Sequence, residues 1–220
     1  MRCARSVALL ALGVLIAPAP QNASAAPPIA DIVESSGQKL ITPETQAAID
    51  RGLAWLAARQ HDAGSFGSAQ YRQNVAVTSL AAMAFLSAGH SPGRGKYGDV
   101  VQKATEFILA RTKPNGFIIE EESTSHGPMY GHGFSTMFLA EVYGMSPNKD
   151  VRQKLEKAVR LIIATQNEEG GWRYYPRVED ADISVTVAQV MALRAARNAG
   201  IFVPKDPIDR SMEYVKGCQN

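Results

Sequence analysis

An internal repeat constrains the fold of this chain more than any other feature. Residues 51–66 (RGLAWLAARQHDAGSF) recur as residues 157–172 (KAVRLIIATQNEEGGW), with a basic residue, a bulky apolar residue, Gln, Gly and an aromatic residue at the same spacing. A third copy begins at Arg210, and a degenerate one begins at Lys103. Because a repeated unit cannot bury its apolar face alone, neighbouring units must stack to share one core.

The four copies define the length and the bounds of the units. Gln60, Thr112, Gln166 and Gln219 occupy one equivalent position, which makes each unit about 53 residues long. We therefore predict three complete units and one incomplete unit, at about residues 45–92, 99–146, 151–202 and 206–220.

Each unit is predicted to contain two helices of different character. The first is amphipathic, with apolar residues at three- and four-residue spacings, and it ends before Gly64 or Gly170. The second, as in residues 77–86 and 185–193, is apolar on every side, which is typical of a buried helix. The prediction is an all-α fold, a partial α/α toroid of about three and a half two-helix repeats with outer amphipathic and inner buried helices.

The N-terminal residues are predicted to lie outside this domain. Residues 1–25 combine Arg2 and Arg5, an apolar run and a small-residue end, as a signal peptide does. The run is shorter than the roughly 20 residues of a membrane span, so no transmembrane anchor is expected. We expect export to the periplasm or the extracellular space after cleavage near Ala25, with residues 26–44 as a linker whose end starts a helix at Pro43.

Charge and cysteine content exclude several classes of protein. Without Arg2 and Arg5, basic and acidic residues are equal in number. Nucleic-acid-binding proteins normally carry a concentrated basic surface, so no nucleic-acid partner is expected. Cys218 is the one cysteine after residue 25, which excludes an internal disulfide framework from the exported chain.

The spacing of the repeat resembles the QW motif of squalene cyclases. Their superfamily of α/α-toroid proteins also contains the β-subunits of protein prenyltransferases, and the resemblance covers residues 45–220. It implies a cavity, lined by the inner helices, that holds an isoprenoid or lipid ligand. The fourth copy reaches Gln219 without its Gly and aromatic residues, so a short or truncated member is expected, and a homo-oligomer could complete the ring.

The same resemblance supplies candidate catalytic residues. Squalene-type cyclases carry an Asp-x-Asp-Asp motif at the start of an inner helix, and its central Asp protonates the substrate. Asp180-Ala-Asp182-Ile183 resembles it, with Asp182 as the central acid, Asp180 as the first and Ile183 in place of the last. A general acid needs a raised pKa, which Asp180 and Glu179 could provide as like charges.

His132 is the third candidate catalytic residue. Aligning the starts of the three inner helices places Asn74, His132 and Asp182 at one level around the axis. Protein prenyltransferase β-subunits bind zinc through an Asp-x-Cys pair and a His, and Asp182-Ile-Ser184 resembles that pair with Ser in place of Cys. Because Ser lacks the thiolate that binds zinc strongly, neither a metal nor another cofactor is expected.

Five further residues are candidates for ligand contact. They lie at the start of one inner helix, in a Gly-rich segment and in an aromatic–basic run: Asn74, Tyr130, Phe134, Arg173 and Tyr174. Simpler roles compete with all of these assignments. Asn74 and Asp182 could cap helices, the aromatic residues could pack between units, and His132 could be held by a backbone carbonyl.

The sequence leaves three functions open. The first is an exported toroid that binds an isoprenoid or other apolar ligand, with unproven catalysis, and the second is a non-catalytic scaffold for protein contacts. The third is a secreted α/α-barrel carbohydrate-active enzyme using Asp180 and Asp182 with an aromatic platform at residues 172–175. Aromatic faces stabilise carbocations, and the chain is only 7% aromatic, so its lining suits a lipid chain better than the guidance of a cation.

Overall fold

Helices form all the regular structure of the described chain. The computed structural model describes residues 41–123 and 127–219, and within them there is no strand. The α-helices are α2 (Pro43–Ala57), α3 (Val75–Ser87), α4 (Gly98–Ala110), α5 (Pro128–Met145), α6 (Lys149–Ala164), α7 (Ile183–Asn198) and α8 (Lys205–Gly217), with the short 3₁₀ turns η1 (Ala69–Tyr71) and η2 (Glu121–Ser123). This confirms the predicted all-α class. None of the described helices combines the length and the apolar content of a membrane span.

The chain divides into two compact units between Gln46 and Ala47. Of the first unit, only residues 41–46 are described, so the predicted signal peptide and nearly all of the predicted linker lie outside the described residues. Helix α2 begins at Pro43, and the backbone N–H of Thr45 donates to Oγ1 of Thr42 at 3.3 Å, as expected for a cap. The helices from α3 onward belong to the second unit.

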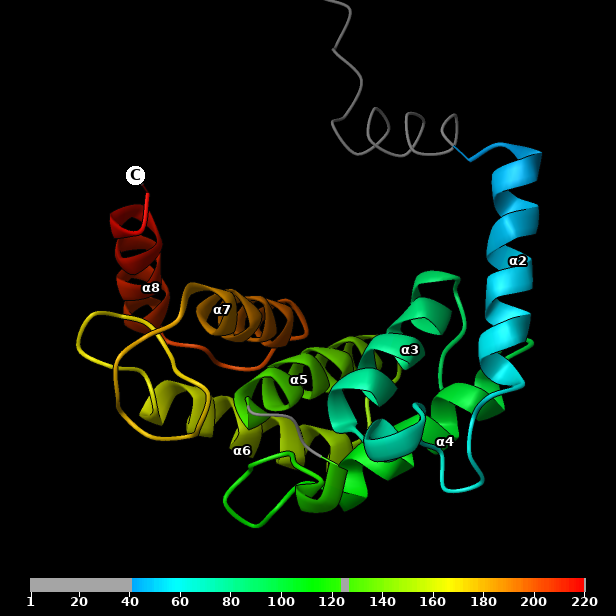
Figure 1. Cartoon of the computed structure of the whole chain (residues 1–220), viewed down its shortest axis with the longest axis horizontal. Helices are drawn as coiled ribbons and strands as arrows, with labels where there is room; N and C mark the ends of the chain where they lie inside the picture. Colours follow the sequence, from blue (N-terminus) through cyan, green and yellow to red (C-terminus); the bar gives the residue numbers. More distant parts are fainter. Residues whose placement is uncertain (1–40, 124–126, 220) are drawn as a thin grey trace, which may run out of the picture. The chain divides into compact units, whose positions relative to one another are not determined.

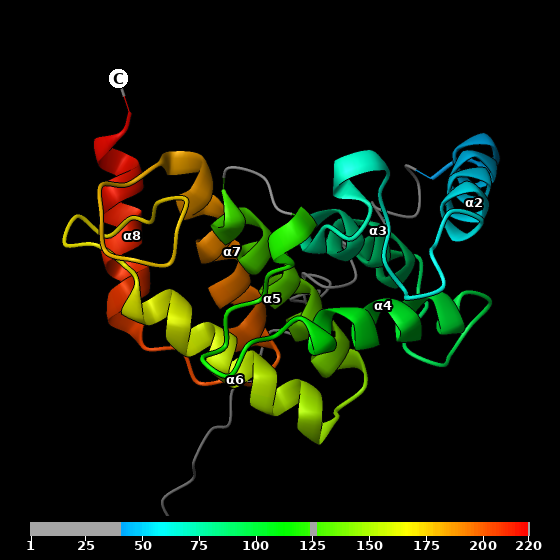
Figure 2. The same cartoon turned by 60° about the horizontal axis from the view of Figure 1, so that its bottom comes forward.

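The apolar helices α3, α5 and α7 lie side by side, with α5 in the middle (Figure 1). Helix α4 packs against α3, and α6 packs against α5 and α7, on the side that comes forward in Figure 2. Phe85, Leu139 and Leu193, one from each of the three apolar helices, are fully buried. We call α3, α5 and α7 the inner helices and α4, α6 and α8 the outer helices.

Glutamine side chains tie the ends of α2 and α6 to the next outer helix along the chain. Nε2 of Gln60, just after α2, donates to the backbone oxygen of Val100 in α4 at 2.8 Å. Nε2 of Gln166, just after α6, donates to the backbone oxygen of Pro207 in α8 at 2.8 Å. The glutamine of the sequence motif therefore connects the end of one amphipathic helix to the first turn of the next.

Glycine follows each of these glutamines because two backbones meet there. Gly64 and Gly170 have positive φ angles of 89° and 93°, as their position after a helix predicts. A Cβ atom at Gly64 would collide with the carbonyl group of Lys103, and one at Gly170 would collide with that of Arg210. A side chain at either position would therefore separate neighbouring helices.

The aromatic residue of the motif packs inside the protein. Trp172 is 1% exposed, and its Nε1 donates to the backbone oxygen of Ile162 at 2.7 Å. Its backbone N–H donates to Oγ1 of Thr186 at 3.1 Å, as that of Phe66 does to Oγ1 of Thr78 at 3.0 Å. These contacts confirm the packing interpretation of the aromatic residue. The closure of the helix pairs into a toroid stays a prediction.

Candidate functional site

The start of α7 carries the densest group of predicted site residues. Asp182 is the N-cap, and its Oδ1 accepts from the backbone N–H groups of Ser184 at 2.9 Å and Val185 at 3.2 Å. The hydroxyl of Ser184 also donates to this oxygen, at 2.5 Å. The second oxygen, Oδ2, accepts from the phenol of Tyr174 at 3.1 Å. Capping, one of the two roles considered for Asp182, is thus confirmed.

These contacts continue into a cluster that we call the Asp182 cluster, formed by Tyr130, Arg173, Tyr174, Asp182 and Ser184. The hydroxyls of Tyr130 and Ser184 lie 2.5 Å apart, which links α5 to α7, and the rings of Tyr130 and Tyr174 lie 6.2 Å apart. The guanidinium of Arg173 stacks over the ring of Tyr174 at 4.5 Å. The sequence therefore predicted four members of one polar group and missed Ser184 as a candidate contact residue.

Arg173 also connects the two predicted acids. Its Nε lies 3.6 Å from Oδ1 of Asp180, and its Nη1 lies 4.0 Å from Oδ2 of Asp182. The side chain of Asp180 is 74% exposed, whereas that of Asp182 is 23% exposed. Asp180 is therefore a solvated partner of Arg173, whereas Asp182 is partly buried.

The electrostatics of Asp182 oppose the predicted raised pKa. The hydroxyl of Ser184, more than any other group, holds the pKa of Asp182 below its ordinary value, and the Val185 N–H and the Tyr174 phenol add to this effect against the cost of desolvation. Hydrogen bonds to a carboxylate favour its charged form. The expectation of a raised pKa was wrong because these donors outweigh the desolvation of the carboxylate. Tyr174 has a raised pKa, chiefly because it donates to the Asp182 carboxylate.

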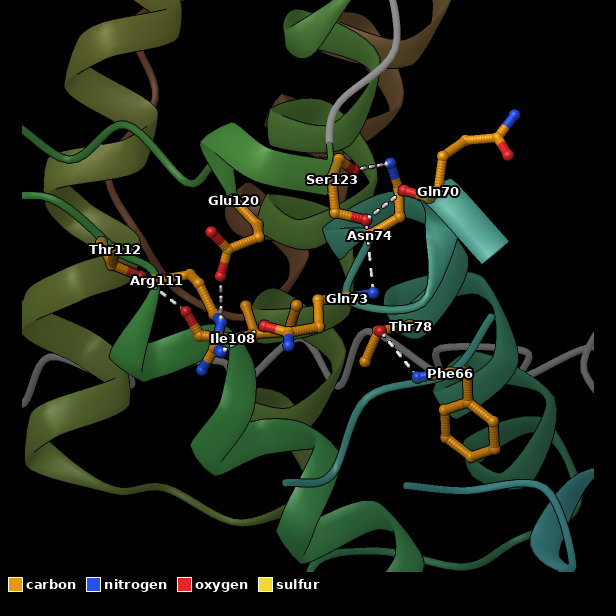
Figure 3. A network of polar contacts seen from close by, with 10 residues as sticks. All are labelled: Phe66, Gln70, Gln73, Asn74, Thr78, Ile108, Arg111, Thr112, Glu120 and Ser123. Atoms are coloured by element: carbon orange, nitrogen blue, oxygen red, sulfur yellow. Dashed lines mark hydrogen bonds and ion pairs between the residues drawn. The ribbon is translucent and has the colours of Figure 1, made fainter. Parts of the chain in front are cut away.

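Asn74 caps α3 but faces a different neighbourhood from Asp182. Its Oδ1 accepts from the backbone N–H groups of Ala76 and Val77, and its Nδ2 donates to the backbone oxygen of Ser123 at 2.6 Å. The hydroxyl of Ser123 in turn donates to the backbone oxygen of Gln70 at 2.7 Å (Figure 3). At 6% exposure, Asn74 joins two loops and is covered by them.

His132 does not lie at the level of Asn74 and Asp182. Helix α5 begins at Pro128, which places His132 inside the helix, where it is fully buried. Nδ1 of His132 accepts from the backbone N–H of Ile118 at 3.2 Å. In the other inner helices, Oγ1 of Thr78 and Oγ1 of Thr186 each accept a backbone N–H from a preceding loop in the same way. The alignment that put His132 level with the two caps was wrong by one helical turn, because it matched Thr136 to the two threonines.

Burial keeps His132 neutral. Desolvation of the charged imidazolium lowers the pKa of His132 to about 4, and the backbone of Ala158 offsets this only in part. Since Nδ1 accepts a hydrogen bond, the proton of the neutral ring resides on Nε2. The T-shaped contact with Phe117, at 5.5 Å, closes a further side of the ring. This environment is that of a packing residue between helices.

One side of each inner helix remains accessible. Around α5, Ser135 contacts α3 through the backbone oxygen of Val75, and Gly133 lies against Gln189 of α7. The side between these two contacts presents residues at three- and four-residue steps that are half-buried or exposed. Extending this register to α3 and α7 defines what we call the inner face: Ala76, Leu80, Met83 and Ser87 of α3; Tyr130, Phe134, Met137 and Glu141 of α5; Ser184, Ala188, Met191 and Ala195 of α7. On α7 this face is accessible at Ser184 and Met191, whereas Ala188 and Ala195 are buried.

The inner face contains a row of methionines that sequence reasoning missed. Met83, Met137 and Met191 occupy the same register on the three helices, at the interval that also separates Thr78, His132 and Thr186. Leu80 is 47% exposed and Met191 is 46% exposed, although both belong to largely buried helices. The three methionines are evenly spaced in the sequence. The mistaken alignment of α5, however, assigned Met137 to a different level from Met83 and Met191.

The candidate residues fall into separate places. Tyr130 and Phe134 lie one turn apart on the inner face, with the Asp182 cluster at its edge. Asn74 and His132 join neither. Two hollows of about 670 Å³ and 540 Å³ lie elsewhere, one beside Trp55, Leu56 and Val77, the other beside Ile163, Ile201 and Phe202. In the described residues, no group of His, Cys, Asp and Glu is arranged to hold a metal ion.

Comparison with known proteins gives one weak relationship. No protein-family model matches the chain. Drimenyl diphosphate synthase of Streptomyces showdoensis is 28% identical over 162 residues, which cover 73% of this chain. The chain spans only 28% of the length of that relative. The similarity to this terpene synthase indicates a terpenoid-cyclase-like relationship.

Proposed function

We propose that this chain is a terpenoid-cyclase-like α/α-toroid protein that binds an isoprenoid on the inner face. The observation that carries the proposal is the accessible apolar side of the three inner helices, with Leu80, Phe134 and Met191 at its centre. An extended apolar surface on a soluble protein normally marks a binding site. The similarity to drimenyl diphosphate synthase favours an isoprenoid over other apolar ligands.

Ligand binding is better supported than proton transfer by the predicted catalytic residues. Asp182 keeps its charge because its oxygens accept four hydrogen bonds, from two backbone N–H groups and from the hydroxyls of Ser184 and Tyr174. Asp180 is solvated, and His132 is buried away from the inner face. We propose that Asp182 positions Tyr130, Tyr174 and α7 at the edge of the ligand site.

A carbohydrate-active enzyme is a weaker alternative. Such an enzyme would need two carboxyl groups that reach the substrate independently. Arg173 lies within 4.0 Å of both Asp180 and Asp182, and Trp172, the first residue of the supposed aromatic platform, is buried. The scaffold alternative keeps the lowered pKa and the capping role of Asp182 in its favour.

We propose that a second copy of the chain covers the open side of α7. Ile183 and Val187 are each 44% exposed, on the side of α7 that does not contact α5. Another inner helix could cover them, as α7 covers α5. Sedimentation of the purified chain should show a dimer or larger ring, and Val187→Asp should shift it to monomer. Sedimentation of the unmutated chain as a monomer would exclude this assembly.

Export is proposed together with this function. The N-terminal residues have the pattern of a signal peptide, with a cleavage site near Ala25. N-terminal sequencing of the protein recovered from cells should begin close to Ala26. A protein that retains Met1 and remains in the cytoplasm would refute the proposed export.

Mass spectrometry of the chain after incubation with a total lipid extract tests the proposed ligand class. We expect an isoprenoid to be retained through gel filtration and released by organic solvent. Retention of an oligosaccharide from a parallel incubation with glycans would favour the carbohydrate alternative. A chain that retains neither class would favour the scaffold.

A further inference from the structure

The inner face bears almost no charge, and this limits the head group that a bound isoprenoid can carry. Along the defined rows the one ionisable carboxyl group is that of Glu141, near the C-terminal end of α5. No Lys or Arg belongs to the inner face. A diphosphate is normally bound by several cationic side chains, often through paired hydrogen bonds from Arg.

At the other end of the rows, the Asp182 cluster is also unfavourable for a diphosphate. Its single cation, Arg173, stacks on Tyr174 and lies within 4.0 Å of the carboxylates of Asp180 and Asp182. The two carboxylates outnumber the guanidinium, and the lowered pKa of Asp182 keeps its charge in place. An additional anion would therefore meet repulsion at this edge.

The nearest basic residues of α7 lie away from the inner face. Arg194 follows Val187 by two helical turns and shares its side of the helix, which is the open side beyond α5. Arg197 lies in the last turn of the same helix. A head group bound there would be outside the rows that end at Tyr130 and Ser184.

The methionine row suits an irregular, branched hydrocarbon. Methionine is unbranched and polarisable, and its flexible side chain adapts to the shape of its partner. Met83, Met137 and Met191 cross the three helices at mid-height, between the Leu80–Phe134 level and the Ser87–Glu141 level. From Ala76 to Ser87 the rows extend about 16 Å at the helical rise, which a farnesyl chain can span.

We propose, on the basis of the proposed function, that the ligand is an uncharged isoprenoid alcohol and not an isoprenoid diphosphate. Its chain lies across the methionine row, and its hydroxyl donates to the phenol oxygen of Tyr130. The Ser184 hydroxyl donates to Asp182, so the Tyr130 hydroxyl donates to Ser184 and its oxygen can still accept. The two hydroxyls lie 2.5 Å apart at the edge of the apolar face and are anchored by the Asp182 carboxylate. Recognition thus combines an adaptable apolar surface with a neutral hydrogen-bond acceptor.

Equilibrium binding of farnesol and farnesyl diphosphate to the full chain tests this assignment. We expect farnesol to bind at least tenfold more tightly than the diphosphate. Equal or tighter binding of the diphosphate would overturn the head-group assignment and leave the proposed function standing. Binding of neither probe would overturn both.

Two sets of variants locate the site. Tyr130→Phe should weaken farnesol binding about two- to tenfold, the usual effect of losing one hydrogen bond, and should leave binding of the hydrocarbon farnesene unchanged. Replacement of Met137 and Met191 by Gln should weaken the binding of both farnesol and farnesene, whereas replacement of both residues by Leu should leave it unchanged. Met212→Gln, at a 47% exposed position on α8, is the matched control. Unchanged binding by the Gln variant would refute the role of the methionine row.

Discussion

The starts of α3 and α7 use the same type of cap in two different environments. Asn74 and Asp182 each accept two backbone N–H groups of their own helix. The remaining polar group of Asn74 is used inside the protein, where Nδ2 donates to the backbone oxygen of Ser123 (Figure 3). The remaining oxygen of Asp182 instead accepts from Tyr174, beside the inner face.

This difference separates residues that stabilise the fold from residues available to a ligand. Asn74 is 6% exposed, and its amide joins the start of α3 to η2 through the backbone oxygen of Ser123. Asp182 organises hydroxyl groups that end at Tyr130, on the accessible side of α5. An amide cap that is fully satisfied by backbone serves stability, whereas a carboxylate cap bonded to phenol and hydroxyl groups can also serve binding.

Helix α5 lies between α3 and α7 and has no side-chain cap. Its buried His132 should make the largest contribution to the pH dependence of the free energy of unfolding. Native His132 has a pKa of about 4, below the ordinary value of 6.5, so below pH 6.5 the unfolded chain binds a proton that the native chain does not. The free energy of unfolding should therefore be intact above pH 6.5 and fall by about 3 kcal/mol by pH 4. Urea unfolding at a series of pH values measures it.

His132→Thr is the matched variant, because Thr occupies the same register in α3 and α7. It should be less stable than the parent chain at pH 7, owing to lost volume, and should lose less stability between pH 6.5 and pH 4. An equal loss in both chains would contradict this prediction, because it would show that another titratable group causes the acid sensitivity.

The next largest effect should come from Asn74→Ala. The variant removes a cap and leaves the buried oxygen of Ser123 without its donor, so the free energy of unfolding should fall by about 2–3 kcal/mol. Chemical denaturation with a circular dichroism readout measures this loss. Ser123→Ala, which keeps the backbone oxygen, is the control and should cost less.

Replacement of Asp182 should cost less stability than replacement of Asn74. Asp182→Ala should lose about 1 kcal/mol, the usual value of an N-cap. Asp182→Asn should lose under about 0.5 kcal/mol, because Asn caps helices as well as Asp does. If Asp182→Ala destabilises the chain as much as Asn74→Ala, the proposed division between a structural cap and a site-organising cap is wrong.

The smallest effect concerns the phenol of Tyr174. Its pKa is raised chiefly by donation to the Asp182 carboxylate, so Asp182→Asn should lower that pKa towards the ordinary value. Ultraviolet-difference titration of tyrosinate measures the shift, and Tyr174→Phe identifies which component belongs to this residue. A Tyr174 component that does not move in Asp182→Asn would mean that the two side chains do not interact in solution.

Much of the fold could be predicted from sequence because its determinants are local. The position of Gly64 and Gly170 after amphipathic helices reflects a positive φ angle and a close backbone approach, both of which require glycine. The all-apolar character of residues 77–86 and 185–193 reflects burial of α3 and α7 on several sides. Pro43 marked the start of α2 for an equally local reason.

The candidate site was less predictable because it depends on contacts between helices. The pKa of Asp182 is set by Ser184 and Tyr174, and the sequence suggested only the opposing influence of Asp180. The register of α5 was misjudged because it begins with Pro128 instead of a capping Asn or Asp. Only the correct register brings Met83, Met137 and Met191 to one level.

Photo-crosslinking with a diazirine analogue of farnesol tests the central claim, that the inner face is the ligand site, most directly. Peptide mapping should place the adducts on α3, α5 and α7, at or next to Met83, Met137 and Met191, and excess farnesol should suppress them. Adducts concentrated in the hollows beside Trp55 or Phe202, with none on the inner face, would contradict the account.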